Sequence, residues 1–303
     1  MKTRFMGRVA LAFVAAACLT AGATLAARQL AMEPLKDAGQ NVYPAFEGWY
    51  QNSDGSYTLL IGYYNRNKKQ TLDIPIGPEN RIEPGGPDQG QPTHFVVGRG
   101  WGTISIKVPK DFGDKKITWT LTANGKTVAI PFGITKGYQI EPYKDAAMGN
   151  TPPKIKLAEG TPEIQGPPAA LSTYPTITGV TGEPVTISYW ITDDGNDEPA
   201  TSGAAPPPAN TPPPAAGGGP PRRVRLSTTL SKYRGPGTIT FADATPNIEK
   251  DKASTTATFS LPGDYVIRIE GNDSSGVGGG GFQCCWTTAY VKVNVKGAST
   301  SGK

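Results

Sequence analysis

Histidine is nearly absent from this chain of 303 residues, in which His94 is the single example. Ser-His-Asp and Cys-His catalytic sites need a histidine near the nucleophile, and His94 follows a Gly/Pro-rich stretch that has no nucleophile motif. The sequence has no P-loop either, and its glycine run at 278–281 lacks the strand-to-helix context of a phosphate-binding loop. These absences argue against catalysis, and we expect a protein that is not an enzyme.

Clusters of basic residues are also missing. The 30 Lys and Arg residues and the 25 Asp and Glu residues give a formal net charge of +5. Residues 1–27 contribute three basic residues and no acidic residue, so the rest of the chain carries only +2. A small charge without clustering is poor support for binding to nucleic acid, and we expect no such partner.

An apolar run occurs at the start of the chain, where residues 1–27 are typical of a secretory signal peptide. Basic residues precede an apolar run at 9–25, and small residues at 26–27 offer a cleavage site. Two alternatives stay open. One is a transmembrane anchor, which the short Ala- and Gly-rich run disfavours, and the other is lipid attachment at Cys18. We expect an extracellular or periplasmic protein with no transmembrane segment in the mature chain.

Helical patterns are missing as well. Gly (38) and Pro (29) are frequent, and both residues are disfavoured inside helices. Instead, β-branched and aromatic residues alternate with period two, for example at Tyr265, Ile267 and Ile269, which is typical of strands with one buried face. The length fits about two domains. The sequence therefore predicts an all-β protein with two β-sandwiches of immunoglobulin or fibronectin type in tandem.

Composition also predicts the boundaries of these parts. They are a signal peptide at 1–27, a linker at 28–40, an N-terminal sandwich at 41–143, a Pro-rich connector at 144–181, a second sandwich at 182–297 with a disordered Pro-rich insertion at 196–221, and a tail at 298–303. Within the first sandwich, residues 77–92 are predicted to be a long loop, and Asn124-Gly125 a tight hairpin turn. Residues 154–157 of the connector are a candidate first strand of the second sandwich.

Three stretches of the second sandwich resemble the PKD-like, Ig-like modules of bacterial surface and secreted proteins. They are PVTISYWITDDG at 184–195, LSKYRGPGTITF at 230–241 and TATFSLPGDYVIR at 256–268. In the last of them a Pro-Gly turn precedes Tyr265, where a β-sandwich has its tyrosine corner. The resemblance implies adhesion, spacing or contact with polysaccharide, and no shared catalytic residues. The insertion at 198–221 and the segment 278–286 depart from the pattern.

The adjacent cysteines Cys284 and Cys285 form an unusual local feature. Alternation places Cys285 on the core face of a strand and Cys284 on the outer face. Three interpretations stay open: one buried and one exposed thiol, a vicinal disulfide, which export permits, and a zinc or copper site. Metal binding is the weakest of the three, because such sites need more ligands.

The same alternation predicts an outward stripe of aromatic rings at Phe282, Trp286 and Tyr290. Exposed rings in a row could stack on sugar rings or contact a partner protein. In the alternative interpretation, the linker or the first sandwich covers them. The first sandwich offers a weaker candidate surface of this kind at Trp49, Tyr50, Tyr63 and Tyr64, for which burial in the core is the favoured interpretation.

Acidic residues gather at the predicted end of a strand and supply a calcium hypothesis. They are Asp193, Asp194, Asp197 and Glu198, and Asp273 lies in a second loop at a strand end. Calcium takes several oxygen ligands, some of which this group could supply. A solvated loop without metal is the favoured alternative, and no other cofactor is expected.

Together these features favour a secreted or surface-attached, non-catalytic protein with an adhesion, spacer or assembly role. Its expected partners are other surface proteins or polysaccharide. The first alternative is a carbohydrate-binding module for an extracellular or cell-wall polysaccharide. The second is a redox or copper-handling protein that uses Cys284 and Cys285.

Overall fold

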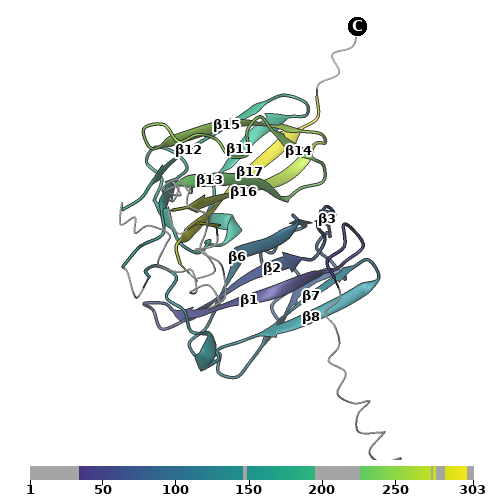
Figure 1. Cartoon of the computed structure of the whole chain (residues 1–303), viewed down its shortest axis with the longest axis vertical. Helices are drawn as coiled ribbons and strands as arrows, with labels where there is room; N and C mark the ends of the chain where they lie inside the picture. Colours follow the sequence, from purple (N-terminus) through teal and green to yellow (C-terminus); the bar gives the residue numbers. More distant parts are fainter. Residues whose placement is uncertain (1–33, 146–148, 195–225, 274–275, 278–283, 299–303) are drawn as a thin grey trace, which may run out of the picture. The chain divides into compact units, whose positions relative to one another are not determined.

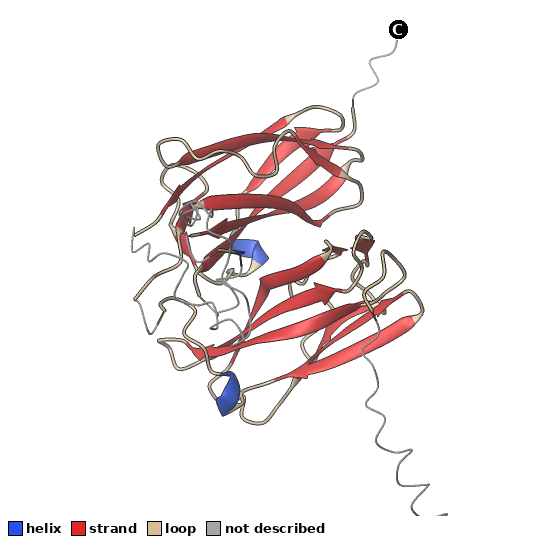
Figure 2. Cartoon of the chain, in the orientation of Figure 1, coloured by secondary structure: helices blue, strands red, loops and turns tan. Residues whose placement is uncertain are grey.

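The computed structural model describes residues 34–145, 149–194, 226–273, 276–277 and 284–298. The predicted signal peptide, with Cys18, and the predicted insertion at 196–221 lie outside these residues. Strands dominate, and the helices drawn in Figure 2 are short 3-10 turns at Lys136–Tyr138 and Leu171–Thr173. The predicted all-β fold is confirmed. Residues 36–303 group into one compact unit.

In the described part of the chain, no helix combines the length and the apolar character that crossing a membrane requires.

The first eight strands form the N-terminal sandwich (Figure 1). They are β1 (Val42–Gln51), β2 (Tyr57–Asn65), β3 (Leu72–Asp73), β4 (Asn80–Glu83), β5 (His94–Phe95), β6 (Gly98–Val108), β7 (Ile117–Ala123) and β8 (Lys126–Phe132). One sheet has the order β1-β2-β6 and another β4-β7-β8, while β3 and β5 pair separately. The predicted Asn124-Gly125 turn joins β7 to β8, and both residues have positive φ, as a tight hairpin turn of this kind requires.

The predicted loop at 77–92 is wrong in part, because it contains β4. This strand pairs with β7, and its Asn80 is fully buried. The Asn80 side chain donates to the carbonyls of Ile74 and Pro92, each at 2.8 Å, and accepts a hydrogen bond from the Trp119 indole at 2.9 Å. Trp119 is at the centre of the core. Flanking Pro and Gly hid a short strand whose two inward residues are the apolar Ile82 and the polar Asn80 with its satisfied hydrogen bonds.

The second sandwich begins inside the predicted connector. Its strands are β9 (Lys154–Lys156), β10 (Ile164–Gln165), β11 (Thr176–Val180), β12 (Val185–Thr192), β13 (Ser227–Arg234), β14 (Ile239–Phe241), β15 (Lys252–Phe259), β16 (Gly263–Asn272) and β17 (Trp286–Lys296). One sheet has the order β10-β9-β12-β15-β14 and the other β11-β17-β16-β13. All neighbouring strands in these two sheets are antiparallel except β11 and β17, which run parallel.

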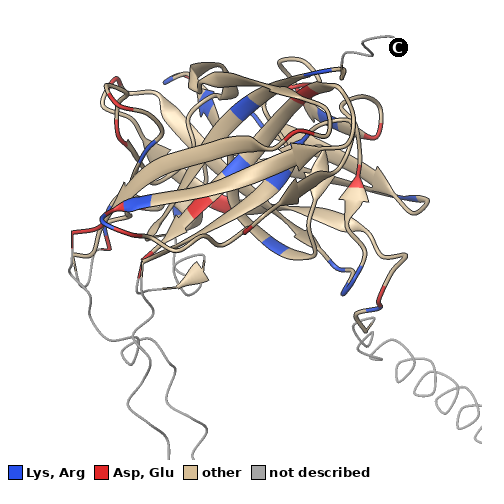
Figure 3. Cartoon of the chain, turned by 90° about the horizontal axis from the view of Figure 1, so that it is seen from above, with Lys and Arg blue, Asp and Glu red and all other residues tan. Residues whose placement is uncertain are grey.

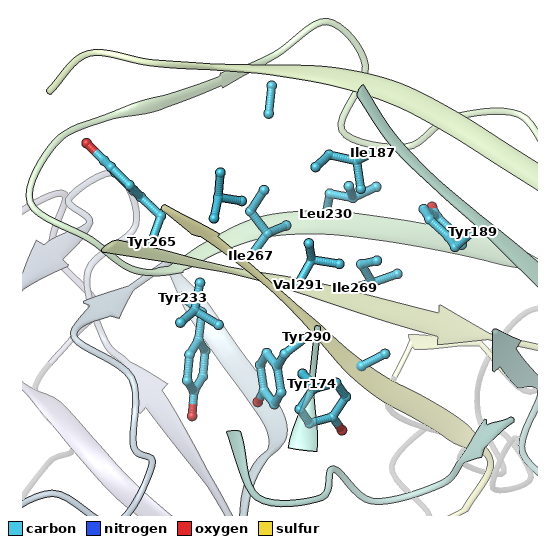
Figure 4. Close-up of a cluster of buried hydrophobic side chains, with 14 of the residues drawn as sticks. Tyr174, Ile187, Tyr189, Leu230, Tyr233, Tyr265, Ile267, Ile269, Tyr290 and Val291 are labelled. Atoms are coloured by element: carbon cyan, nitrogen blue, oxygen red, sulfur yellow. The ribbon is translucent and has the colours of Figure 1, made fainter. Parts of the chain in front are cut away.

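The core of the second sandwich lies between these two sheets. Figure 4 shows Ile267, Ile269, Leu230 and Val291 pointing toward Ile187 of the facing sheet. Burial of these inward rows is the main force that holds the two sheets together.

Tyr265 forms the predicted tyrosine corner. Its hydroxyl donates to the carbonyl of Leu261 at 2.8 Å and accepts from the backbone N–H of Gly237 at 3.1 Å. The ring packs directly on Gly235, which has a φ of 140° and no room for a side chain because a Cβ would clash with the ring. A Cβ at Gly237 would likewise clash with the Tyr265 hydroxyl, so both glycines of the GPG sequence are required by close approach to Tyr265.

Candidate functional site

The most unusual surface of the second sandwich is the outer face of the sheet β11-β17-β16-β13. Alternation places Tyr233 of β13, Arg268 and Glu270 of β16, and Trp286 and Tyr290 of β17 on this face, and we call it the interdomain face. In the register of β16 and β17, Arg268 lies opposite Tyr290, and Asn272 lies opposite Trp286. All of these side chains are buried. The face therefore packs against protein, and its contacts are with the N-terminal sandwich.

Two tyrosines join the interdomain face to the strand β6. The Tyr233 hydroxyl lies 2.7 Å from the carbonyl of Gly90 and 2.8 Å from the carbonyl of Thr103, and the Tyr290 hydroxyl donates to the same Thr103 carbonyl. The two rings pack with their centroids 4.6 Å apart. In Figure 4, Tyr233 and Tyr290, with Tyr174 beside them, lie on the opposite side of the sheet from Ile267 and Ile269. Burial raises the pKa of Tyr233 and Tyr290, which keeps both phenols protonated as hydrogen-bond donors.

Arg268 is a buried charge at the centre of the interdomain face. Its guanidinium donates to the carbonyl of Trp101 at 2.7 Å and to the Thr288 hydroxyl at 3.2 Å, and it pairs with Glu270. Burial alone would lower the pKa of Arg268, but the Glu270 carboxylate and the neighbouring Tyr290, Tyr63 and Tyr233 together outweigh this, and the pKa is raised. The arginine is therefore charged in a dry environment, and its loss would leave Glu270 as an unpaired buried anion.

A second buried ion pair lies close by in the N-terminal sandwich. Glu47, which is 4% exposed, accepts a hydrogen bond from Arg99 at 2.8 Å, and the Arg99 guanidinium lies 4.5 Å from the centroid of the Trp101 ring. Burial raises the pKa of Glu47, although the charge of Arg99 opposes that shift. Trp101 thus links the two ion pairs, since its ring contacts Arg99 and its carbonyl binds Arg268.

Ion pairs at the edge of the interdomain face add a third kind of contact. Arg234 binds Asp88 with two hydrogen bonds of 2.7 and 3.0 Å, and Lys232 lies 2.8 Å from Asp73. The hydrogen bonds from Arg234 lower the pKa of Asp88. For Asp73, burial would raise the pKa, but hydrogen bonds from Lys232 and His94 outweigh it and the pKa is lowered. Both aspartates are therefore held in the charged form.

The predicted outward stripe of aromatic rings is wrong for Trp286 and Tyr290. They are 4% and 1% exposed, because the N-terminal sandwich covers them. Trp286 packs with Leu60 and Ile140, and its ring centroid lies 6.4 Å from that of Trp101. The alternative interpretation, coverage by the first sandwich, describes what is found. Phe282 lies outside the described residues.

The two cysteines are both buried, so the interpretation with one buried and one exposed thiol is wrong. Their sulfur atoms lie at bonding distance from each other, and the Cys285 sulfur is 3.5 Å from the carbonyl oxygen of Asn150. The pair therefore sits beside the chain that links the two sandwiches. In the residues that the structure describes, no group of three or more His, Cys, Asp and Glu side chains could hold a metal ion.

The acidic residues of the calcium hypothesis lie around the same linking chain. Asp273 is fully buried and accepts a hydrogen bond from the Asn150 side chain at 2.7 Å, while Asp194 accepts one from Thr151 at 2.8 Å. Asp193 precedes Asp194 in the loop after β12, and Asp197 and Glu198 lie outside the described residues. These hydrogen bonds give Asp194 and Asp273 a structural role, and calcium binding stays an untested hypothesis.

The aromatic residues of the first sandwich follow the favoured interpretation only in part. Trp49 and Tyr63 are buried in the core, whereas Tyr50 and Tyr64 are half-buried. The Tyr50 hydroxyl lies 3.2 Å from that of Tyr143. These residues do not form one exposed surface.

Sequence reasoning missed the interdomain face as a site. Arg268 and Glu270 alternate with core residues in YVIRIEG, so the predicted strand with one buried face places them on its outer face and says nothing of what covers them. Local sequence gave no signal of this burial, since three of the four outward positions of residues 265–272 are Arg268, Glu270 and Asn272, as expected of a strand with one wet face.

No protein-family model and no curated protein sequence matches this chain. Among solved structures, domains 4 and 5 of the S-layer protein SbsC are 9% identical, cover 60% of this chain and 65% of their own, and give a TM-score of 0.24. A tandem of titin Ig domains is 8% identical, covers 86% of this chain and 100% of its own, and gives 0.22. An endo-fucoidan hydrolase is 11% identical, covers 88% of this chain and 28% of its own, and gives 0.23. At these values the likeness carries no inference about function.

Proposed function

We propose that this protein is exported and acts without catalysis at the cell surface or outside the cell, as a spacer or assembly module made of two sandwiches held as one body. The PKD-like character of the second sandwich is part of this proposal. The observation that carries it is the buried interdomain face. Domains joined by a linker move relative to each other unless a substantial apolar interface holds them.

The composition of the interdomain face supports a fixed arrangement. Tyrosine hydroxyls bind backbone carbonyls, and Arg268 binds the carbonyl of Trp101, so a change of orientation would leave buried polar groups without partners. The Arg234–Asp88 pair adds directional contacts at the edge. A spacer or lattice module benefits from such rigidity, because it transmits a defined geometry between its two ends.

Calorimetry of the exported protein tests the fixed arrangement. We expect one cooperative unfolding transition for both sandwiches in the wild type, and separation into two transitions when Arg268 and Tyr290 are both replaced by Ala. The matched control replaces Ser254 and Thr256, which lie on the outer face of β15, by Ala. We expect this variant to unfold in one transition, as the wild type does. Two independent transitions in the wild type would overturn the rigid-spacer proposal.

Intact mass of the protein recovered outside the cytoplasm tests export. We expect the mass to show cleavage close to residue 27. If Cys284 and Cys285 form a vicinal disulfide, their thiols will be alkylated only after reduction. Added lipid on Cys18 would place the spacer on a membrane surface. Full-length protein retained in the cytoplasm would contradict the proposal.

The carbohydrate-binding alternative needs a surface other than the predicted stripe, because Trp286 and Tyr290 are covered. Trp190 supplies one, since it lies half-buried on the outer face of the five-stranded sheet. This alternative is compatible with a spacer that also attaches to a polymer.

A further inference from the structure

A cavity of about 410 Å³ opens on the outer face of the sheet β10-β9-β12-β15-β14, away from the interdomain face. Its volume lies within the roughly 300–1,000 Å³ of small-molecule sites. The lining residues used below are Lys154, Lys156, Glu163, Trp190, Thr192 and Asp251. They come from two neighbouring strands, from the segment that leads into β10, and from the turn before β15.

The alternation of β12 places Trp190 in this cavity. Tyr189 and Ile191 on either side of it are fully buried in the core, so Trp190 must point away from the core. In the register of the sheet, Trp190 lies between Lys156 of β9 and Lys252 of β15. The Lys252 ammonium lies 5.1 Å from the centroid of the Trp190 ring, which is a cation–π contact at one side of the ring.

The cavity has one aromatic wall, and its other walls are polar and of both signs. Three lysines and three acidic residues line it, and Lys154 lies 3.4 Å from Glu163. Across the described residues, Figure 3 shows Lys and Arg on many strands and Asp and Glu mostly on the connecting loops. Balanced charge does not select a strongly charged ligand. It offers many hydrogen-bond donors and acceptors beside a flat apolar surface.

A saccharide matches this combination. A pyranose ring has one face of C–H groups that can pack on an indole, and its edge carries hydroxyls that both donate and accept hydrogen bonds. Ammonium groups of lysine only donate and carboxylates only accept, so the two kinds together can bind hydroxyls in either sense. A purely apolar ligand would leave these polar groups desolvated, and a multiply charged ion would meet a like charge on the wall.

We propose that this cavity is a saccharide-binding site, in which a sugar ring packs on Trp190 and its hydroxyls bind Lys156, Glu163 and Asp251. This assignment goes beyond the spacer role and does not depend on it, because the interdomain face contributes none of these residues. It gives the carbohydrate-binding alternative a surface in place of Trp286 and Tyr290, which are covered.

Affinity electrophoresis of the full exported protein tests the site. The gels contain a neutral β-glucan, a polymer of N-acetylglucosamine or a polyuronate, so that the three arms separate neutral, amide-bearing and acidic saccharides. We expect retardation by at least one of the polymers, and a loss of affinity of at least tenfold in Trp190→Ala. The folded state of the variant is checked by its thermal unfolding, which we expect to be unchanged because Trp190 is outside the core.

Two further variants locate the binding. Asp251 has a positive φ of 61°, which Asn also tolerates, so Asp251→Asn removes the carboxylate without straining the backbone. We expect the affinity for the retarding polymer to fall about three- to tenfold. Tyr138→Ala removes another exposed ring, from the N-terminal sandwich, and should leave binding unchanged. Failure of all three polymers to retard the wild type would overturn the proposal, as would full binding by Trp190→Ala. Neither result would affect the single unfolding transition expected of the spacer.

Discussion

The two outer faces of the second sandwich have similar sequence patterns and opposite environments. On β17 and β16, Trp286, Tyr290 and Arg268 are buried beneath the N-terminal sandwich. On β12 and β15, Trp190 and Lys252 occupy equivalent alternate positions and face solvent. Alternation therefore identifies which residues share a face, whereas the neighbour that covers that face is set by tertiary contacts far away in sequence. A large aromatic residue on an outer face can be an interface anchor or a ligand platform.

The largest expected difference between the faces concerns charge. Arg268→Ala should lower the free energy of unfolding by about 3–5 kcal/mol, because it leaves Glu270 as a buried anion without its partner. Lys252→Ala, the matched change on the solvent face, should stay within about 0.5 kcal/mol. Urea denaturation measures both. A loss below about 1 kcal/mol for Arg268→Ala would mean that water reaches the interdomain face.

The two tryptophans provide the next comparison. Trp286→Ala should cost about 3 kcal/mol, at the lower end of large-to-small core substitutions, because the half-buried Trp101 ring beside it can move into part of the space. Trp190→Ala should change the free energy of unfolding by less than about 0.5 kcal/mol. Equal effects in thermal unfolding experiments would show that the faces do not differ as described.

Removing one hydroxyl from the interdomain face should have a smaller effect. Tyr290→Phe loses the hydrogen bond to the Thr103 carbonyl, but Tyr233 remains within reach of that carbonyl, so we expect a cost of about 1 kcal/mol. The double variant that also carries Tyr233→Phe leaves the carbonyl without either donor and should cost more than the sum of the single changes. Simple additivity in chemical denaturation would contradict a shared acceptor.

The smallest expected effect is a dependence on pH at the edge of the interdomain face. Arg234 lowers the pKa of Asp88 in the folded state below the value near 3.9 of an unfolded aspartate. Its stabilisation is therefore present above about pH 4 and is lost as the pH falls through the lower folded pKa. Because the side chain of Asp88 is 48% exposed, the contribution should be at most about 1 kcal/mol. Asp88→Asn should flatten the plot of unfolding free energy against pH between about pH 2 and pH 5. An unchanged plot would show that the Arg234–Asp88 pair does not contribute to this pH dependence.

Local signals in the sequence predicted much of the second sandwich. The Pro-Gly turn before Tyr265 predicted the tyrosine corner, and the alternation in β16 predicted its core side. The strand β4 was not predictable, because its role depends on Asn80 binding the Trp119 indole from another strand. The prediction of the binding surface was wrong for a related reason. Whether Trp286 or Trp190 faces solvent depends on the packing of one sandwich on another, which local periodicity does not record.

The parallel pairing of β11 with β17 has a mechanical consequence. β17 pairs antiparallel with β16 over most of its length, and its second half, Lys292–Lys296, also pairs in parallel with β11 on the other side. A pull directed along β17 loads both rows of hydrogen bonds in shear, so that many must break together, whereas a pull across the strand would open them one at a time. The last strand of the second sandwich is therefore arranged to hold tension applied along its own axis.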